Sequence, residues 1–464
     1  MISFGRYSGF WCMVFFLFGH ILYSDPAASG KNGASSGYDP FAIDDSVERT
    51  SSTEWTFELT DYTYDREHAV SETENLKHCR IMADISIPVS HHLLFAGIEA
   101  SSRFSQNHQH NEAVVRELYF EIRPDMDFGF LEDVYLRAGI QMFSWGSGVL
   151  FNPTDNLSPF NVVDPFDTYR RGVPGLKLSL SSGTQTLEID CLGSFRQSIL
   201  PDLEERFFIH SPHTIPNPFY PGIGPELLDV RFTEIDRSFE PDVTLRECQY
   251  GAKYTASIKG WDIACSYFKG YENIPLFEGE PVVLDPVGGT ADIKLNYIYP
   301  EQEVTGIDIS GYIGKTGLHV EYADFNMYDS GHSVGVGDED YESIIAGIEY
   351  PFNNVFGQQD ISVSLEYARE IKDEEDDRIY INRIYRDSVL LRVTHTVNFK
   401  TSGELLYVYN MDTEGSYGRL SYTHLYSDHA SIKAGIDVFE GPEDCFFGEY
   451  DRNDRVFIDF KLMY

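Results

Sequence analysis

Alternation of apolar and polar residues, with a period of two, runs through most of this chain. It begins with Trp55, Phe57 and Leu59 and continues into the final segment, residues 455–464, where Val, Ile, Phe and Leu alternate with Arg, Asp and Lys. A period of two places one set of side chains on each face of a β-strand. Because the pattern recurs in segment after segment with no helical period, the sequence predicts an all-β fold.

Charged residues interrupt only one of the two strand faces. Glu121, Arg137, Arg392 and Lys461 each lie in mid-strand, opposite a face that is almost purely apolar. A soluble sandwich of two packed sheets could produce this pattern in any single strand. Across 464 residues, of which 14% are aromatic, one closed membrane barrel with a polar interior fits better. The expected fold is a transmembrane antiparallel β-barrel.

The connections between the expected strands give an independent test, because short periplasmic turns and long outer loops should alternate in such a barrel. The segment 291–299 has strand character, but counting it as a spanning strand would break the alternation, so it is assigned to an ordered part of an outer loop. The remaining connections give about eighteen strands. Short turns are expected at 89–92, 124–132, 182–185, 258–261, 314–317, 350–358, 398–402 and 427–430. Long or polar loops are expected at 65–74, 104–112, 145–172, 196–246, 271–301, 328–340, 371–382, 410–416 and 441–454.

The first residues have the character of a secretion signal. Arg6 precedes a short apolar run, residues 10–18, and small residues follow, so cleavage after Ser24 or Ser29 is expected. The organisation predicted is a signal peptide over 1–24, a flexible periplasmic lead-in over 25–52 and an outer-membrane barrel over 53–464. The expected location is the outer membrane of a Gram-negative type envelope. The formal net charge of −39 argues against a nucleic-acid partner.

The most specific stretch of the sequence follows the strand at 133–143. The end of that strand, the turn-rich segment 145–172 and the strand after it contain a distinctive set of residues: Gly139, Gln141, Trp145, Gly146, Asn152, Pro153, Thr154, Asp155, Leu157, Pro159, Arg170, Arg171, Gly172, Pro174 and Leu176. This pattern resembles a porin-like family of outer-membrane β-barrels, with the alginate-export porins as more distant relatives. The resemblance implies an outer-membrane barrel and supplies no substrate.

Segment 145–172 also contains the strongest group of candidate site residues. Its apolar residues need burial that open water cannot provide, so the segment is expected to fold into the barrel lumen. Opposed carboxylates and guanidiniums would then narrow a pore. The alternative is that they cap turns and fix the loop to the wall, and both roles can belong to the same residues. The candidate constriction residues are Asp155, Asp164, Asp167, Arg170 and Arg171 in the loop, with Arg137 and Glu121 on the wall.

Other features give weaker indications. The acidic runs at 338–340 and 373–377 lack a calcium-loop spacing, and His108 and His110 lack a third ligand, so no metal site or cofactor is expected. No nucleophile-elbow motif is present, and no enzyme activity is expected. The apolar loop 207–228 is either a plug or a partner surface. Five scattered cysteines follow the signal segment, and a pair such as Cys191 with Cys265 stays open: Cys79, Cys191, Cys248, Cys265 and Cys445.

The function expected from these features is an outer-membrane channel or substrate-selective transporter, through which a small or extended solute passes a lumen narrowed by segment 145–172. The alternative is a non-conducting barrel that binds or anchors surface polysaccharide or another partner through its loops. Besides membrane lipid and the solute, one partner is expected. The last strand alternates and ends in the aromatic Tyr464, so the barrel-assembly machinery is expected to recognise it.

Overall fold

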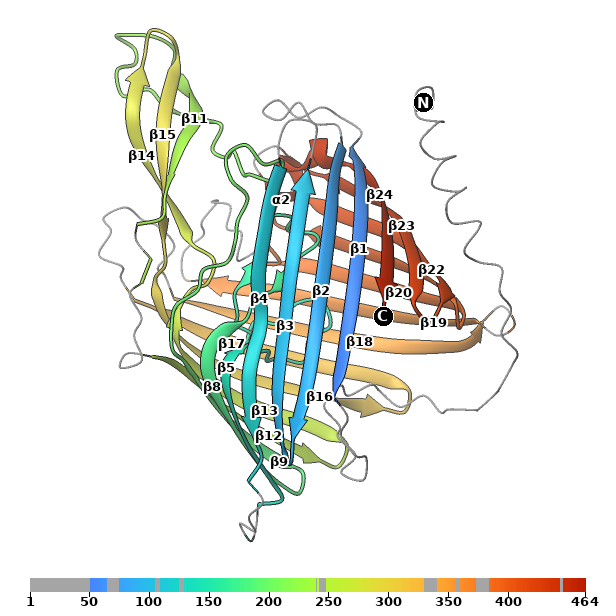
Figure 1. The fold of residues 1–464 in the computed structure, drawn as a ribbon. Helices are drawn as coiled ribbons and strands as arrows, with labels where there is room; N and C mark the ends of the chain where they lie inside the picture. Colours follow the sequence, from blue (N-terminus) through green and yellow to red (C-terminus); the bar gives the residue numbers. More distant parts are fainter. Residues whose placement is uncertain are drawn as a thin grey trace. The chain divides into compact units, whose positions relative to one another are not determined.

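Eighteen strands form one closed antiparallel sheet in the computed structural model (Figure 1). The structure describes residues 51–64, 75–104, 109–124, 129, 131–238, 240–241, 248–328, 340–355, 357, 359–372, 384–442 and 445–464. The signal segment, most of the lead-in, His108 and the acidic runs, apart from Asp340, lie outside them. The barrel strands are β1 (Ser52–Tyr64), β2 (Asn75–Val89), β3 (His92–Phe104), β4 (Gln109–Ile122), β5 (Asp133–Gln141), β8 (Val173–Ser182), β9 (Gln185–Leu192), β12 (Gln249–Ile258), β13 (Trp261–Tyr271), β16 (Glu301–Ile313), β17 (Thr316–Met327), β18 (Tyr341–Val355), β19 (Gln359–Lys372), β20 (Ser388–Asn398), β21 (Thr401–Asn410), β22 (Ser416–Ser427), β23 (Ala430–Glu440) and β24 (Arg455–Met463).

The first and last strands close the barrel. β24 pairs with β1 from Thr56 opposite Met463 to Tyr64 opposite Arg455. The Tyr464 amide extends this seam by donating to the Trp55 carbonyl over 2.8 Å. Closure leaves no edge strand at the seam, so backbone groups there find partners within the sheet. The expected barrel of about eighteen strands is confirmed.

The two faces of the sheet separate as the alternation predicts. In β24, Arg455 and Phe457 are buried toward the interior, while Val456 between them is 47% exposed on the outside. The same parity holds in β5, where Arg137 and Gln141 are buried. The residues expected on the lipid-facing side all lie on the outward face: Leu136, Ile140, Leu391, Val393, Ile458 and Phe460.

Short turns occupy one end of the barrel. Two-residue turns join β2 to β3, β8 to β9 and β12 to β13. In the last of these both Lys259 and Gly260 have positive φ, as a turn that matches the strand twist requires. The long connections alternate with these turns along most of the chain. Two expected bounds are wrong: the loop expected at 104–112 gives way to strand at Gln109, where β4 begins, and most of the turn expected at 350–358 lies within β18, which runs to Val355. Among the described residues, no helix is long and apolar enough to cross a membrane.

A second, four-stranded sheet is built from two of the long loops. Its order is β10 (Thr214–Pro216), β11 (Leu227–Asp236), β15 (Thr290–Ile298) and β14 (Leu276–Asp285), with β11 and β15 parallel. The assignment of segment 291–299 to an ordered part of a loop is therefore confirmed. Nothing in the sequence indicates that its partner strand, β11, comes from the preceding long loop.

The outward assignment of Val393, the central residue of β20, leads to a stability prediction. Val393→Arg should destabilise the barrel by roughly 2–4 kcal/mol, the cost of a cation at the middle of a bilayer. The matched control is Thr394→Arg, because Thr394 faces inward and pairs with Glu404 on β21. Urea unfolding of the refolded protein in lipid vesicles measures both variants. Equal stability of the two variants would contradict the inference that Val393 points outward and Thr394 points inward.

Candidate functional site

The chain turns into the barrel directly after β5. Residues 142–172, here called the lumen loop, contain Phe143 and Trp145, which are almost completely buried. Gly146 has a φ of +96°, and a Cβ there would lie 2.5 Å from the Asn152 side chain, so only glycine permits this turn. The lumen loop carries two very short strands, β6 (Phe160–Asn161) and β7 (Tyr169–Arg170).

Backbone amides of the lumen loop donate to two buried glutamates on the wall. Glu321 of β17 accepts from the amides of Ser147 and Thr154 over 2.9 and 2.8 Å, and from the Thr154 hydroxyl. Glu366 of β19 accepts from the amides of Val149 and Leu150, over 2.6 and 3.1 Å. A buried carboxylate needs several donors, and a loop crossing a lumen has amides without strand partners. The lumen loop therefore supplies the donors that the two carboxylates need, and the carboxylates supply the acceptors that the loop amides need.

These two glutamates are not among the candidate site residues identified from the sequence. Both occur in the tripeptide Glu-Tyr-Ala, at 321–323 and 366–368. In each case the glutamate and alanine point inward and are buried, and the tyrosine points outward. The repeated tripeptide was the only signal available, and it does not indicate the partner.

Candidate residues Asp155 and Arg170 form an ion pair within the lumen loop. Asp155 also accepts from the Trp145 amide over 3.3 Å, and Arg170 donates to the Phe143 carbonyl over 3.2 Å. Burial raises the pKa of the Asp155 carboxyl, although Arg170 opposes that shift. Arg171 does not join this pair, because its guanidinium donates to the Gln197 carbonyl over 3.0 Å.

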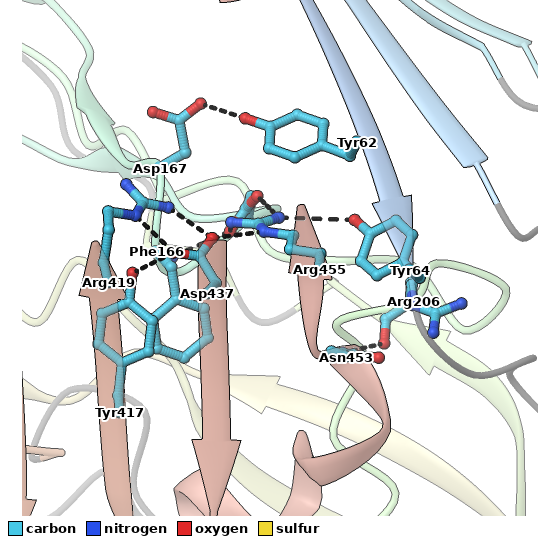
Figure 2. A network of polar contacts seen from close by, with 11 residues as sticks. Tyr62, Tyr64, Phe166, Asp167, Arg206, Tyr417, Arg419, Asp437, Asn453 and Arg455 are labelled. Atoms are coloured by element: carbon cyan, nitrogen blue, oxygen red, sulfur yellow. Dashed lines mark hydrogen bonds and ion pairs between the residues drawn. The ribbon is translucent and has the colours of Figure 1, made fainter. Parts of the chain in front are cut away.

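Asp164 and Asp167 contact strands from both ends of the chain. Figure 2 shows Asp167 beside Tyr62. Asp164 pairs with Arg455 of β24, which also donates to Asp437 of β23 over 2.6 Å. Asp167 accepts from the Tyr62 hydroxyl of β1 over 2.9 Å. The lumen loop thus spans from β5 to the closing seam of the barrel.

Aromatic packing accompanies these polar contacts. The Phe166 ring lies 4.5 Å from the rings of Tyr417 and Phe439, measured between centroids. Phe207, from the following loop, contacts the same ring at 5.9 Å. Tyr450 lies just after the short helix α2 (Phe446–Glu449) and completes the cluster on the other side. The described residues of loop 207–228 thus include a plug-like part, with Phe207 buried.

The wall candidates Glu121 and Arg137 form a pair of their own. They face each other on β4 and β5, and Arg137 donates to Glu121 over 2.8 Å. The expected inward residues next to them do contact the lumen loop. Glu117 accepts from the Met142 amide over 3.0 Å, and Glu188 accepts from the Trp145 indole over 2.8 Å. The candidate residues therefore fall into three separate groups, with Arg171 outside them, rather than into one ring.

Cys191 and Cys265 lie on β9 and β13, with β12 between them. All five cysteines among the described residues are free thiols. The open possibility of a Cys191–Cys265 disulfide is thus not realised in this structure.

Comparison with known proteins gives matches among solved structures alone. No family model matches the chain, and no curated protein matches it. A mutant of the Rh. blastica porin matches with 9% identity and a TM-score of 0.38, over 89% of this chain and 100% of that one. The Acinetobacter baumannii protein OccAB3 matches with 9% identity and a TM-score of 0.47, over 89% and 99%.

The contacts of Asp167 predict a pH dependence. Burial opposes ionisation, but the nearby arginines, Arg419 first, and the Tyr62 hydroxyl lower the pKa of Asp167 below its ordinary value of 3.8. Its stabilising effect is therefore complete above pH 3.8 and is lost as pH falls through the lower folded-state value. Asp167→Asn should cost about 1.5–3 kcal/mol at pH 7, as for hydrogen bonds to a charged group.

Urea unfolding between pH 2 and 7 measures this difference. Asp155→Asn is the matched control, because the pKa of Asp155 is raised. The Asp155 carboxyl therefore becomes less favourable to stability as pH rises, whereas the Asp167 carboxyl becomes more favourable. The same pH dependence in both variants would contradict the two assignments.

Proposed function

We propose that this protein is an outer-membrane channel whose lumen is narrowed by the lumen loop. The observation that carries the proposal is the fixation of that loop inside a closed barrel. Carboxylates on β17 and β19 hold one part of the loop, and Arg455 on β24 holds another. A loop held on several sides of a polar lumen keeps a defined cross-section, which a selective pore requires.

The proposed selectivity depends on charges that are paired within the lumen. Asp155 is neutralised by Arg170, and Arg171 has only a backbone carbonyl as partner among the described residues. Removing both arginines leaves Asp155 unpaired and takes two positive charges away. Arg170→Ala with Arg171→Ala should therefore shift ion selectivity toward cations.

Planar bilayers with a salt gradient measure this shift as a change in reversal potential. The matched control is Lys315→Gln with Lys400→Gln, which removes two positive charges from the turns after β16 and β20. A folded arginine variant whose reversal potential equals that of the control would show that these arginines only hold the scaffold. A panel of solutes in the same bilayers, uronate oligomers included because of the resemblance to alginate-export porins, tests what passes.

The proposed route to the membrane depends on the last strand. Deleting residues 460–464 removes the lower half of β24, including the pairs of Phe460 with Leu59 and of Met463 with Thr56. The closing seam then keeps only the pairs from Thr60 with Asp459 to Tyr64 with Arg455, and the aromatic end proposed as the recognition element of the assembly machinery is missing. The truncated chain should reach the periplasm without inserting into the outer membrane.

Cell fractionation and heat-modifiable migration on gels measure insertion. Lys461→Gln is the control, since it keeps the alternation and the aromatic end. Insertion of the truncated chain at the level of this control would contradict the proposed role of the last strand.

A binding function is the second candidate, favoured by the four-stranded sheet. Apolar side chains on and beside this sheet are at least half exposed, among them Val282, Val283 and Val287 near the β14–β15 turn and Phe219 and Tyr220 in the loop before β11. An exposed patch of this kind is typical of a partner surface. Stepwise conductance of the reconstituted protein favours the channel, and its absence in folded protein favours the binding function.

A further inference from the structure

The four barrel strands that follow β4 are short. β5, β8, β9 and β12 have nine, ten, eight and ten residues, whereas β1 to β4 have thirteen to fifteen. β4 pairs with β3 from Gln109 to Glu121, but with β5 only from Leu118 to Ile122. The described part of β4 before Leu118 therefore has no strand partner on its β5 side. This gap in the wall is called the notch.

Unpaired strand backbone at a membrane is tolerated only where protein covers it or a polar cavity adjoins it. At the notch, protein covers part of the unpaired backbone and a polar cavity adjoins it. Gly172 packs at its base so closely that a Cβ would lie 2.1 Å from the Arg116 carbonyl oxygen. Above this contact lies a cavity of about 540 Å³. Its lining includes Val115 and Ile140, which belong to the outward apolar face, so the cavity opens through the wall.

The cavity is cationic, although the chain as a whole carries a net charge of −39. Four arginines and two glutamates line it: Arg116, Arg170, Arg171, Arg196, Glu112 and Glu240. Arg116 and Arg170 are paired with Asp84 and Asp155.

The other two arginines, Arg171 and Arg196, have no carboxylate partner among the described residues. They donate to the carbonyls of Gln197 and Gly172, over 3.0 and 2.8 Å. Burial and the charge of Arg171 lower the pKa of Arg196. Two guanidiniums that line one cavity and repel each other form a site that an anionic group would stabilise.

The cavity at the notch adjoins a second one inside the barrel. That cavity, of about 530 Å³, is lined by Tyr62 and Tyr64 of β1 and by Arg206 of the following loop. Asn161 and Tyr169 line both cavities and are joined by a hydrogen bond of 2.8 Å. The small β6–β7 hairpin thus separates a chamber open to the outward face from a chamber in the lumen.

We propose that the notch admits an anionic amphiphile laterally. Its carboxylate or phosphate group binds between Arg171 and Arg196, and its alkyl chain leaves along Val115 and Ile140 toward the membrane. The hairpin that carries Asn161 and Tyr169 stands between this site and the lumen. The inference rests on the proposed placement of the barrel in an outer membrane, and it names an anionic amphiphile as a solute class.

Direct binding to the full chain in nanodiscs tests the proposal without any measurement of conductance. The probes are radiolabelled dodecanoate, dodecyl phosphate, acetate, inorganic phosphate and dodecyltrimethylammonium, with empty nanodiscs subtracted. We expect saturable binding of dodecanoate and dodecyl phosphate, at least tenfold weaker binding of acetate and inorganic phosphate, and no saturable binding of the cationic amphiphile. Equal binding of short and long anions, or of the cationic amphiphile, would overturn the proposal.

Two variants locate the site. Arg171→Gln with Arg196→Gln should weaken dodecanoate binding at least tenfold, whereas Lys315→Gln with Lys400→Gln should leave it unchanged. Because the two arginines also hold backbone carbonyls, Ile140→Trp provides a second test that keeps them. It should weaken dodecanoate binding and leave that of acetate unchanged. Unaltered dodecanoate binding in both folded variants would overturn the proposal, while conductance without any dodecanoate binding would overturn it and leave the channel function intact.

Discussion

Hydrogen bonding of the backbone is the constraint on which the structure depends. In the proposed outer-membrane setting, a sheet that faces lipid finds no water for its amides and carbonyls, so its first and last strands must meet. The pairing of β1 with β24 meets this demand over nine residue pairs. The same demand applies inside the barrel, where the lumen loop has amides and no strand beside it. Glu321 and Glu366 accept these amides and fix the path of the loop.

The lumen loop in turn depends on residues from widely separated strands. Its beginning is held by β17 and β19, and its later part is held by the aromatic cluster around Phe166 together with β1 and β24. Interior packing of this kind differs from that of a soluble core, because buried charges and rings are mixed in the same cluster. Arg455, for example, lies between Asp164 and Asp437 and also over the Tyr62 ring at 4.4 Å.

The fold could be predicted from the sequence because strand alternation is local. The facing of Arg137 or Val393 follows from its immediate neighbours, and the order of turns and loops follows from Gly, Pro and Asn content. The entry of the lumen loop could also be predicted, since its apolar residues require burial. The residues that the lumen loop contacts could not be predicted. Glu321 meets the Ser147 amide across 174 residues of chain, and nothing near either residue encodes that contact. Asp164 and Asp155 look alike in the sequence, yet one pairs across the lumen and the other within the loop. The parallel pairing of β11 with β15 joins two loops, and it could not be predicted from the sequence either.

The unequal strand lengths have a mechanical consequence for any bilayer that surrounds this barrel. A hydrocarbon layer of uniform thickness cannot match both the fifteen residues of β2 and the eight of β9. Strands of nine and ten residues also occur at β24 and β21, so the short strands are not confined to one part of the wall. Lipid must thin beside the short strands, or the barrel must tilt, and either adjustment costs a fraction of a kcal/mol for each ångström of mismatch. The unequal strand lengths would therefore make the fit of the barrel in its bilayer sensitive to lipid chain length.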